Sequence, residues 1–346
     1  MKKIGMCCIV LFTINSALLA ETLSTASILF KTGQSYEATL VTSKLKVEIG
    51  QKILDIPFCN ILSLNTAGEL SDYEKQCVDE SLDTLLGKNR GADRHVGAFM
   101  QTDRRLCELA TAQLVDIGLP VISPLFAALP EVDYREPKAA YRLYARIIPG
   151  GYADCEDRTL DLIRCKDGQA LRGKILNKDL ELRKSSSSKT EIIVFSSIRR
   201  LGIRQKRIDR VFDIHSYEHC TQVEFLDSGI ILTSDSQLQQ RAQGYIHLCY
   251  SPDLSCWSSG PDGLTEDAKT GHQPNNKIDG FAYGAILGRI GPDGPCWLGG
   301  SNVTKTGLGV GRLYFAINDS SHFQNNIGSY RVNLKVTNAY DIGEAK

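Results

Sequence analysis

The sequence predicts an α+β protein of several domains, with a C-terminal β-sandwich, two small all-β repeat units and one small helical insert. Three observations lead to this prediction. One short motif occurs twice, near residues 31 and 166, each time between alternating apolar strands. Helix start and stop signals are concentrated in residues 67–150, and the last third alternates short apolar strands with turns rich in Gly, Pro and Asn.

The first 20 residues have the pattern of a secretory signal peptide. Lys2 and Lys3 supply positive charge, residues 4–19 are apolar, and Ala20 offers a small residue at a cleavage site. The apolar run is too short to be a convincing membrane span. We therefore expect an exported protein in the periplasm, at the cell surface or outside the cell, with no transmembrane segment in the mature chain.

The first repeat unit is expected over residues 21–66 and the second over residues 156–205. The shared motif is Lys-x-Gly-Gln, beginning at Lys31 and at Lys166, and it predicts a tight hairpin because Gly accepts a positive φ. Each copy predicts a small meander of short strands. The two copies are expected to pack on each other or to form twin half-barrels.

The insert at residues 67–150 is predicted to be helical. Ser71 and Glu74 form a capping box that starts a helix ending at Gly87. A second helix, with an apolar face, is expected to end at Gly118. The insert weakly resembles one HEAT-type helical repeat, a unit that presents a surface, so it is a candidate for docking a protein partner.

Composition and charge exclude some classes of function. The 346 residues include 40 basic and 40 acidic side chains, and 42% are hydrophobic, as in soluble globular proteins. The one basic cluster, residues 199–210, has few aromatic side chains, so a solvated linker is favoured over a phosphate-binding surface. We place that linker at residues 206–220 and expect no nucleic-acid partner.

Nine cysteines remain after residue 20, an odd number that leaves at least one free thiol in an exported protein. Cys249 and Cys256 are the favoured disulfide pair because both fall in one long loop. His215, His219 and Cys220 have helical metal spacing but no fourth ligand, so a zinc site is disfavoured.

The most informative stretch lies near the C-terminus. A strand at residues 311–317 leads into Asn318-Asp319, and Asn325-Asn326 leads into another strand. One carboxylate and two amides in such a loop can converge on a hard cation such as calcium. A plain hairpin is the alternative, because Asn and Asp are also ordinary turn formers.

This stretch resembles the PA-IL-like family of galactose-binding bacterial lectins. The resemblance covers about residues 221–336 of an expected domain at residues 221–346. Further matches lie upstream in the same order, in the segments 223–230, 242–244, 260–263 and 280–291. The resemblance implies a β-sandwich that binds one Ca²⁺ and holds a sugar through two hydroxyls that complete the metal's coordination.

Carried over residue by residue, the resemblance assigns a ligand set. The implied metal ligands are Asp319, the backbone oxygen of His322, and the side chains of Asn325 and Asn326. The implied sugar-binding residues are His272, Gln273, Asp319 and Asn325. A site with few carboxylates suits this role, because it binds calcium weakly and leaves coordination positions open for sugar hydroxyls.

No catalytic motif is found in residues 21–220, neither a nucleophile elbow, a His-Glu-x-x-His pair nor a phosphate-binding glycine loop. We therefore expect no enzyme. The sequence favours a secreted calcium-dependent, galactose-type carbohydrate-binding protein. The alternative is a structural or protein-interaction module of the envelope whose lectin-like sandwich is degenerate.

Overall fold

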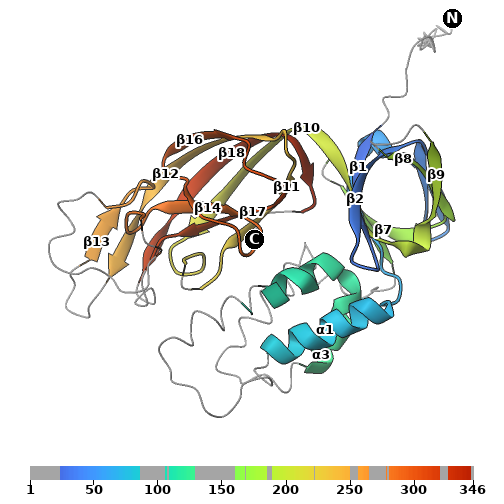
Figure 1. The fold of residues 1–346 in the computed structure, drawn as a ribbon, viewed down its shortest axis with the longest axis horizontal. Coiled ribbons are helices and arrows are strands. Elements are labelled where there is room, and N and C mark those ends of the chain that lie inside the picture. Colours follow the sequence, from blue (N-terminus) through green and yellow to red (C-terminus); the bar gives the residue numbers. More distant parts are fainter. Residues whose placement is uncertain are drawn as a thin grey trace, which may run out of the picture.

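The computed structural model describes residues 24–85, 106, 109–128, 160–167, 169–184, 189–221, 223–249, 256–264, 278, 280–319 and 326–343 (Figure 1). As predicted, the chain is predominantly β, with several units and a small helical insert (Figure 1).

The two repeats together supply the strands of one barrel-shaped unit (Figure 1). The first repeat contributes β1 (Thr25–Phe30), β2 (Ser35–Leu40), β3 (Lys44–Ile49), β4 (Lys52–Pro57), the 3₁₀ turn η1 (Phe58–Asn60) and β5 (Ile61–Asn65). The second contributes β6 (Asp161–Cys165), β7 (Ala170–Ile175), β8 (Asp179–Lys184), β9 (Thr190–Val194), the 3₁₀ turn η5 (Phe195–Ser197) and the start of β10 (Ile198–His215).

The repeats exchange strands rather than forming two separate meanders. The strands pair in the order β9-β8-β2-β1-β10-β5-β6-β7-β3-β4. Replacing each strand by its counterpart in the other repeat reverses this order, so the repeats are related by an approximate twofold axis. The last strand of each repeat pairs with the first strand of the other, because β5 pairs with β6 and β10 with β1.

Turn geometry repeats with the strands. The amide of Lys31 donates to the carbonyl of Ser197 at 2.9 Å, and the amide of Lys166 donates to that of Asn60 at 2.9 Å. Gly33 has φ of 79° in the first hairpin, as its sequence predicts. One continuous core lies inside the barrel and takes side chains from both repeats, among them Ile28, Leu45, Phe58, Ile163, Leu180 and Phe195.

The helical insert packs beside the barrel (Figure 1). It contains α1 (Asp72–Leu85), a helical segment at 109–117, the 3₁₀ turn η2 (Leu119–Val121) and α3 (Ile122–Ala128). The capping box is confirmed, since the Ser71 amide donates to Glu74 Oε2 at 2.8 Å and the Glu74 amide to Ser71 Oγ at 3.2 Å. Gly118, with φ of 79°, ends the second helix as expected. The expected end of α1 at Gly87 lies outside the described residues.

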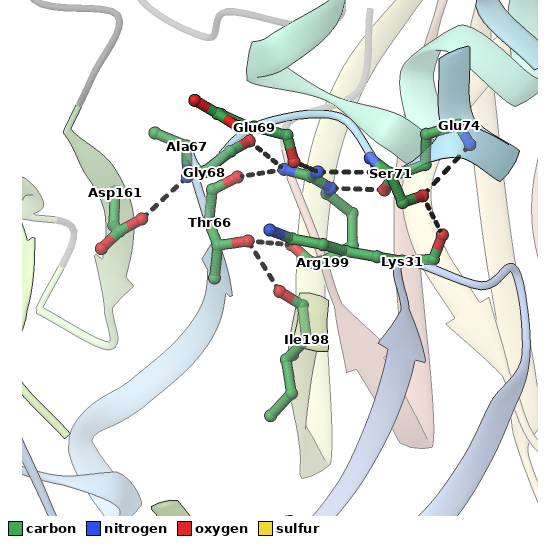
Figure 2. A network of polar contacts seen from close by, with 10 residues as sticks. All are labelled: Lys31, Thr66, Ala67, Gly68, Glu69, Ser71, Glu74, Asp161, Ile198 and Arg199. Atoms are coloured by element: carbon green, nitrogen blue, oxygen red, sulfur yellow. Dashed lines mark hydrogen bonds and ion pairs between the residues drawn. The ribbon is translucent and has the colours of Figure 1, made fainter. Parts of the chain in front are cut away.

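A buried ion pair fixes the insert to the barrel (Figure 2). Arg199 of β10 is 1% exposed and forms a bidentate ion pair with Glu74 of α1. The Nε–Oε1 distance is 2.6 Å and the Nη2–Oε2 distance is 2.7 Å. Its remaining N–H groups donate to the backbone oxygens of Thr66, Gly68 and Glu69. The prediction of a solvated basic cluster is therefore wrong for Arg199, because a carboxylate and three carbonyls together replace water around its guanidinium.

Strand β10 runs through both units. Its residues 198–203 pair with β1 of the barrel, and residues 204–215 pair with β18 of the sandwich. The linker predicted at 206–220 is therefore replaced, up to His215, by continuous strand. This part of β10 alternates charged side chains that face solvent with apolar side chains that pack in the sandwich core. The apolar side chains are Ile208, Phe212 and Ile214.

The C-terminal unit is a β-sandwich, as predicted (Figure 1). Its other strands are β11 (Leu226–Leu232), β12 (Gln237–Cys249), β13 (Cys256–Ser259), β14 (Ile286–Ile290), β15 (Trp297–Leu298), β16 (Asn302–Thr306), β17 (Gly311–Ile317) and β18 (Ile327–Asp341). In one layer β18 lies between β10 and β12, and β12 also pairs with β13 and β16. In the other, β17 lies between β11 and β14, and β14 pairs with β15.

The three units meet at Asp116 in the insert. Its Oδ1 accepts hydrogen bonds from Arg200 of β10 and from Arg312 of β17, each at 2.8 Å. Arg312 also contacts Asp227 at 2.8 Å. Burial alone lowers the pKa of Arg312, but the charges of Asp227 and Asp116 outweigh burial and raise it. Among the residues that the structure describes, no helix is long and apolar enough to cross a lipid bilayer.

Candidate metal and sugar site

The end of β17 and the start of β18 bring two of the predicted ligands together. Asp319 follows β17 and is fully buried, and Asn326 precedes β18 and is 7% exposed. Asn326 Nδ2 donates a hydrogen bond to Asp319 Oδ2. Two residues seven apart in sequence thus form a buried polar pair, which we call the Asp319–Asn326 pair.

Asn318, the neighbour of Asp319, has a structural role. Its side-chain oxygen accepts from the amide of Ile278 at 2.9 Å, and its Nδ2 lies within 3.2 Å of the carbonyls of Ile278, Phe281 and Ala282. Because Asn318 is fully buried and fastened to the segment that precedes β14, the backbone that carries Asp319 is held in a defined place.

A turn after β10 contacts both members of the pair. The carbonyl of Ser216 accepts from Asn326 Nδ2 at 3.3 Å. The hydroxyl of Thr221 lies 3.1 Å from the carbonyl oxygen of Asp319 and 3.0 Å from its amide nitrogen. Sequence reasoning missed both residues, since it assigned residues 206–220 to a linker and gave Thr221 no role. No local pattern indicates that this turn returns to the end of β17.

Tyr330 of β18 supports the site from inside the sandwich. Its side chain is fully buried, and its hydroxyl lies between the carbonyl oxygens of Ser259, Gly260 and Gly284, at 3.1, 2.7 and 3.0 Å. Burial raises the pKa of this phenol. Tyr330 is the aromatic residue of the motif that carries the lectin resemblance, and here it connects β18 to two loops near the site.

The donor atoms of the pair suit a hard cation. Asn326 Oδ1 is buried and has no hydrogen-bond partner in the part of the chain that the structure describes. Such an oxygen is costly to leave unsatisfied, and calcium accepts amide and carboxylate oxygens with loose geometry. The pair therefore fits as part of a calcium site. Among the described residues there is no group of three or more His, Cys, Asp or Glu side chains that could hold a metal.

The other four predicted site residues lie outside the part of the chain that the structure describes. His322 and Asn325, predicted as metal ligands, lie outside the described residues, and so do the predicted sugar contacts His272 and Gln273. The structure thus brings Asp319 and Asn326 together and leaves the remaining four assignments as predictions.

The two histidines with metal-like spacing do not lie on a helix. His215 ends β10, and His219 lies in the following turn, where its Nδ1 accepts from the His215 amide at 3.1 Å. A ring nitrogen used in this way closes the turn rather than facing an ion.

Comparison with known proteins gives only distant likenesses, all to solved structures. No protein-family model matches the chain, and no curated protein matches it. Among solved structures, the chain is similar to the EclA N-terminal domain, described as a PllA-like lectin, with 13% sequence identity and a TM-score of 0.28. The match covers 38% of this chain and 98% of that domain.

Proposed function

We propose that the sandwich is a calcium-dependent carbohydrate-binding module of the PA-IL-like kind, selective for galactose-type sugars. The observation that carries the proposal is the Asp319–Asn326 pair, in which a buried carboxylate adjoins an amide oxygen without a partner among the described residues. Sequence resemblance over about residues 221–336 supports it independently of the contacts.

The chemistry of the donors sets the expected affinity. Asp319 and the side chains of Asn325 and Asn326 would hold the ion, together with the backbone oxygen of His322. With one carboxylate in the set, calcium binding is expected to be weak, and the bound ion would offer open coordination positions to two vicinal sugar hydroxyls. Asp319 and Asn325 would hydrogen-bond the same hydroxyls, and His272 or Gln273 would contact the far side of the sugar.

The rest of the chain is proposed to display this module outside the cytoplasm. The signal-like residues 1–20 support export, and the helical insert, joined to the strand-exchanged barrel through Arg199 and Glu74, is the proposed docking surface for a protein partner. The proposal assigns no catalytic reaction to the chain.

A second function is favoured by one contact. Asn326 already donates to Asp319, so part of the pair is satisfied without an ion. This contact supports an envelope interaction module in which the sandwich keeps the lectin-like fold and has lost the sugar. The two functions differ in whether any glycan is bound.

A glycan array probed with the purified protein, in millimolar calcium and in chelator, separates them. The lectin proposal predicts retention on densely displayed galactosides that is lost in chelator and weakened by His272→Ala. Dense display matters because linked sites convert a second contact into an intramolecular one. Absence of any calcium-dependent glycan ligand, with calcium binding intact, would leave the interaction module.

A further inference from the structure

The turn that follows β10 forms a short β-bridge with the end of β17. Cys220 makes a parallel bridge with Ile317. The Thr221 amide donates to the Ile317 carbonyl at 2.8 Å, and the Ile317 amide donates to the carbonyl of His219 at 2.8 Å. The segment 219–221 is therefore held by backbone hydrogen bonds where β17 ends and Asp319 begins.

The Thr221 side chain extends this contact to Asp319 through two hydrogen bonds. Its hydroxyl donates to the Asp319 carbonyl and accepts from the Asp319 amide, at 3.1 and 3.0 Å. Thr221 is 5% exposed, so water has little access to replace either contact. One side chain thus satisfies both backbone polar groups of the residue that bears the carboxylate, and fixes the direction in which that carboxylate leaves the chain.

The other end of the same turn orients Asn326. Ser216 accepts from Asn326 Nδ2 at 3.3 Å, and Asp319 accepts from the same nitrogen. Both contacts need a donor, so they decide that the terminal atom of Asn326 facing Asp319 and Ser216 is the amide nitrogen. The Ser216 amide and hydroxyl both donate to the carbonyl of Gly328, at 3.1 and 3.0 Å, and so attach the turn to β18.

We propose that Thr221 is a positioning residue of the candidate site, acting through the Asp319 backbone to hold the carboxylate against Asn326. The expected effect of Thr221 on calcium affinity rests on the proposed calcium-dependent function. The contacts between the Thr221 hydroxyl and the Asp319 backbone are present in the protein without ligand. Residues that orient metal ligands typically change metal affinity by about 10- to 100-fold when they are replaced.

The test compares Thr221→Val, Thr221→Ser and Thr233→Val in the full-length protein. Valine keeps the shape of threonine and removes the hydroxyl, whereas serine keeps the hydroxyl. Thr233 is the matched control, because it is also 5% exposed and its hydroxyl bonds a backbone carbonyl elsewhere in the sandwich, that of Asn338 at 2.7 Å.

Two measurements are made on each protein: the calcium dissociation constant by calorimetry, and hydrogen exchange at the Asp319 amide without calcium. We expect Thr221→Val to weaken calcium binding about 10- to 100-fold and to speed exchange at Asp319. We expect Thr221→Ser to restore both, and Thr233→Val to change neither.

The two measurements separate the inference from the function. If the unmodified protein binds no calcium, the proposed function is wrong, and amide exchange alone decides the role of Thr221. Faster exchange at Asp319 in Thr221→Val, reversed by serine, supports positioning. Unchanged exchange in Thr221→Val overturns it, and so does an unchanged calcium affinity in that variant when the unmodified protein binds calcium.

Discussion

Replacing Glu74 with glutamine should release the helical insert from the barrel. The substitution keeps the size of the side chain and removes one charge of a pair whose members are 1% and 2% exposed. Arg199 would retain its contacts to the backbone oxygens of Thr66, Gly68 and Glu69, but its charge would be buried without a counter-ion (Figure 2).

The magnitude follows from that burial. Breaking a buried ion pair by neutralising one partner costs about 3–5 kcal/mol, mainly because the remaining charge is uncompensated. Since each 1.4 kcal/mol is about tenfold in an equilibrium constant, local opening of α1 should become more frequent by roughly two to four powers of ten. The barrel and sandwich cores do not depend on this pair and should be little affected.

Native-state hydrogen exchange of the α1 amides measures this opening directly, with amides of β17 as an internal reference. Asp72→Asn is the control in the same helix, because Asp72 pairs with Lys75 at 3.3 Å on the surface and its loss should change exchange less than about tenfold. A change in α1 for Glu74→Gln no larger than for Asp72→Asn would refute the assignment of the buried pair as the anchor.

Other predictions concern the unit junction, the sandwich core and the cysteines. Asp116→Asn, which weakens both arginine contacts of that residue, should increase protease cleavage within residues 109–128 without changing the unfolding of the sandwich. Tyr330→Phe leaves three carbonyls without their hydroxyl and should cost about 1–3 kcal/mol of unfolding free energy in urea titrations. Because burial raises the Tyr330 pKa in the folded state, its stabilisation is present below about pH 10 and declines above it, and the variant should show a shallower decline between pH 9 and pH 11. Cys249 and Cys256 are directly opposite in the β12–β13 register, so mass spectrometry of the non-reduced, alkylated protein should find them linked, and two alkylated thiols would reject the pair.

The sequence was sufficient where a local rule decides the structure. The capping box at Ser71 and Glu74 and the hairpin glycine at Gly33 need only neighbouring residues, and both are as predicted. The sandwich and the closeness of Asp319 to Asn326 follow from an ordered set of motifs. In these cases the determining residues are close together in the chain or belong to one recognisable pattern.

It was insufficient where long-range pairing decides. A strand of one repeat can pair with a strand of its own repeat or with the equivalent strand of the other repeat. The repeated motif is the same in both arrangements, so it does not indicate the exchange. Arg199 lies in a run of basic residues, and only its partner 125 residues away explains its burial. The turn at residues 216–221 has no distinctive pattern, so the role of Thr221 beside Asp319 could not be read from the chain.

Calorimetric titration of calcium into the purified protein tests the central claim most directly. We expect weak, saturable binding that Asp319→Asn abolishes, because the change removes the charge and keeps the shape of the side chain. Asp213→Asn, which neutralises a partly exposed carboxylate of β10 that contacts Arg331, should bind calcium like the unmodified protein. Bound calcium should also stabilise the fold by about 2.7 kcal/mol at a hundredfold excess over its dissociation constant. Equal calcium affinity in Asp319→Asn and the unmodified protein, or no binding in either, would contradict the account.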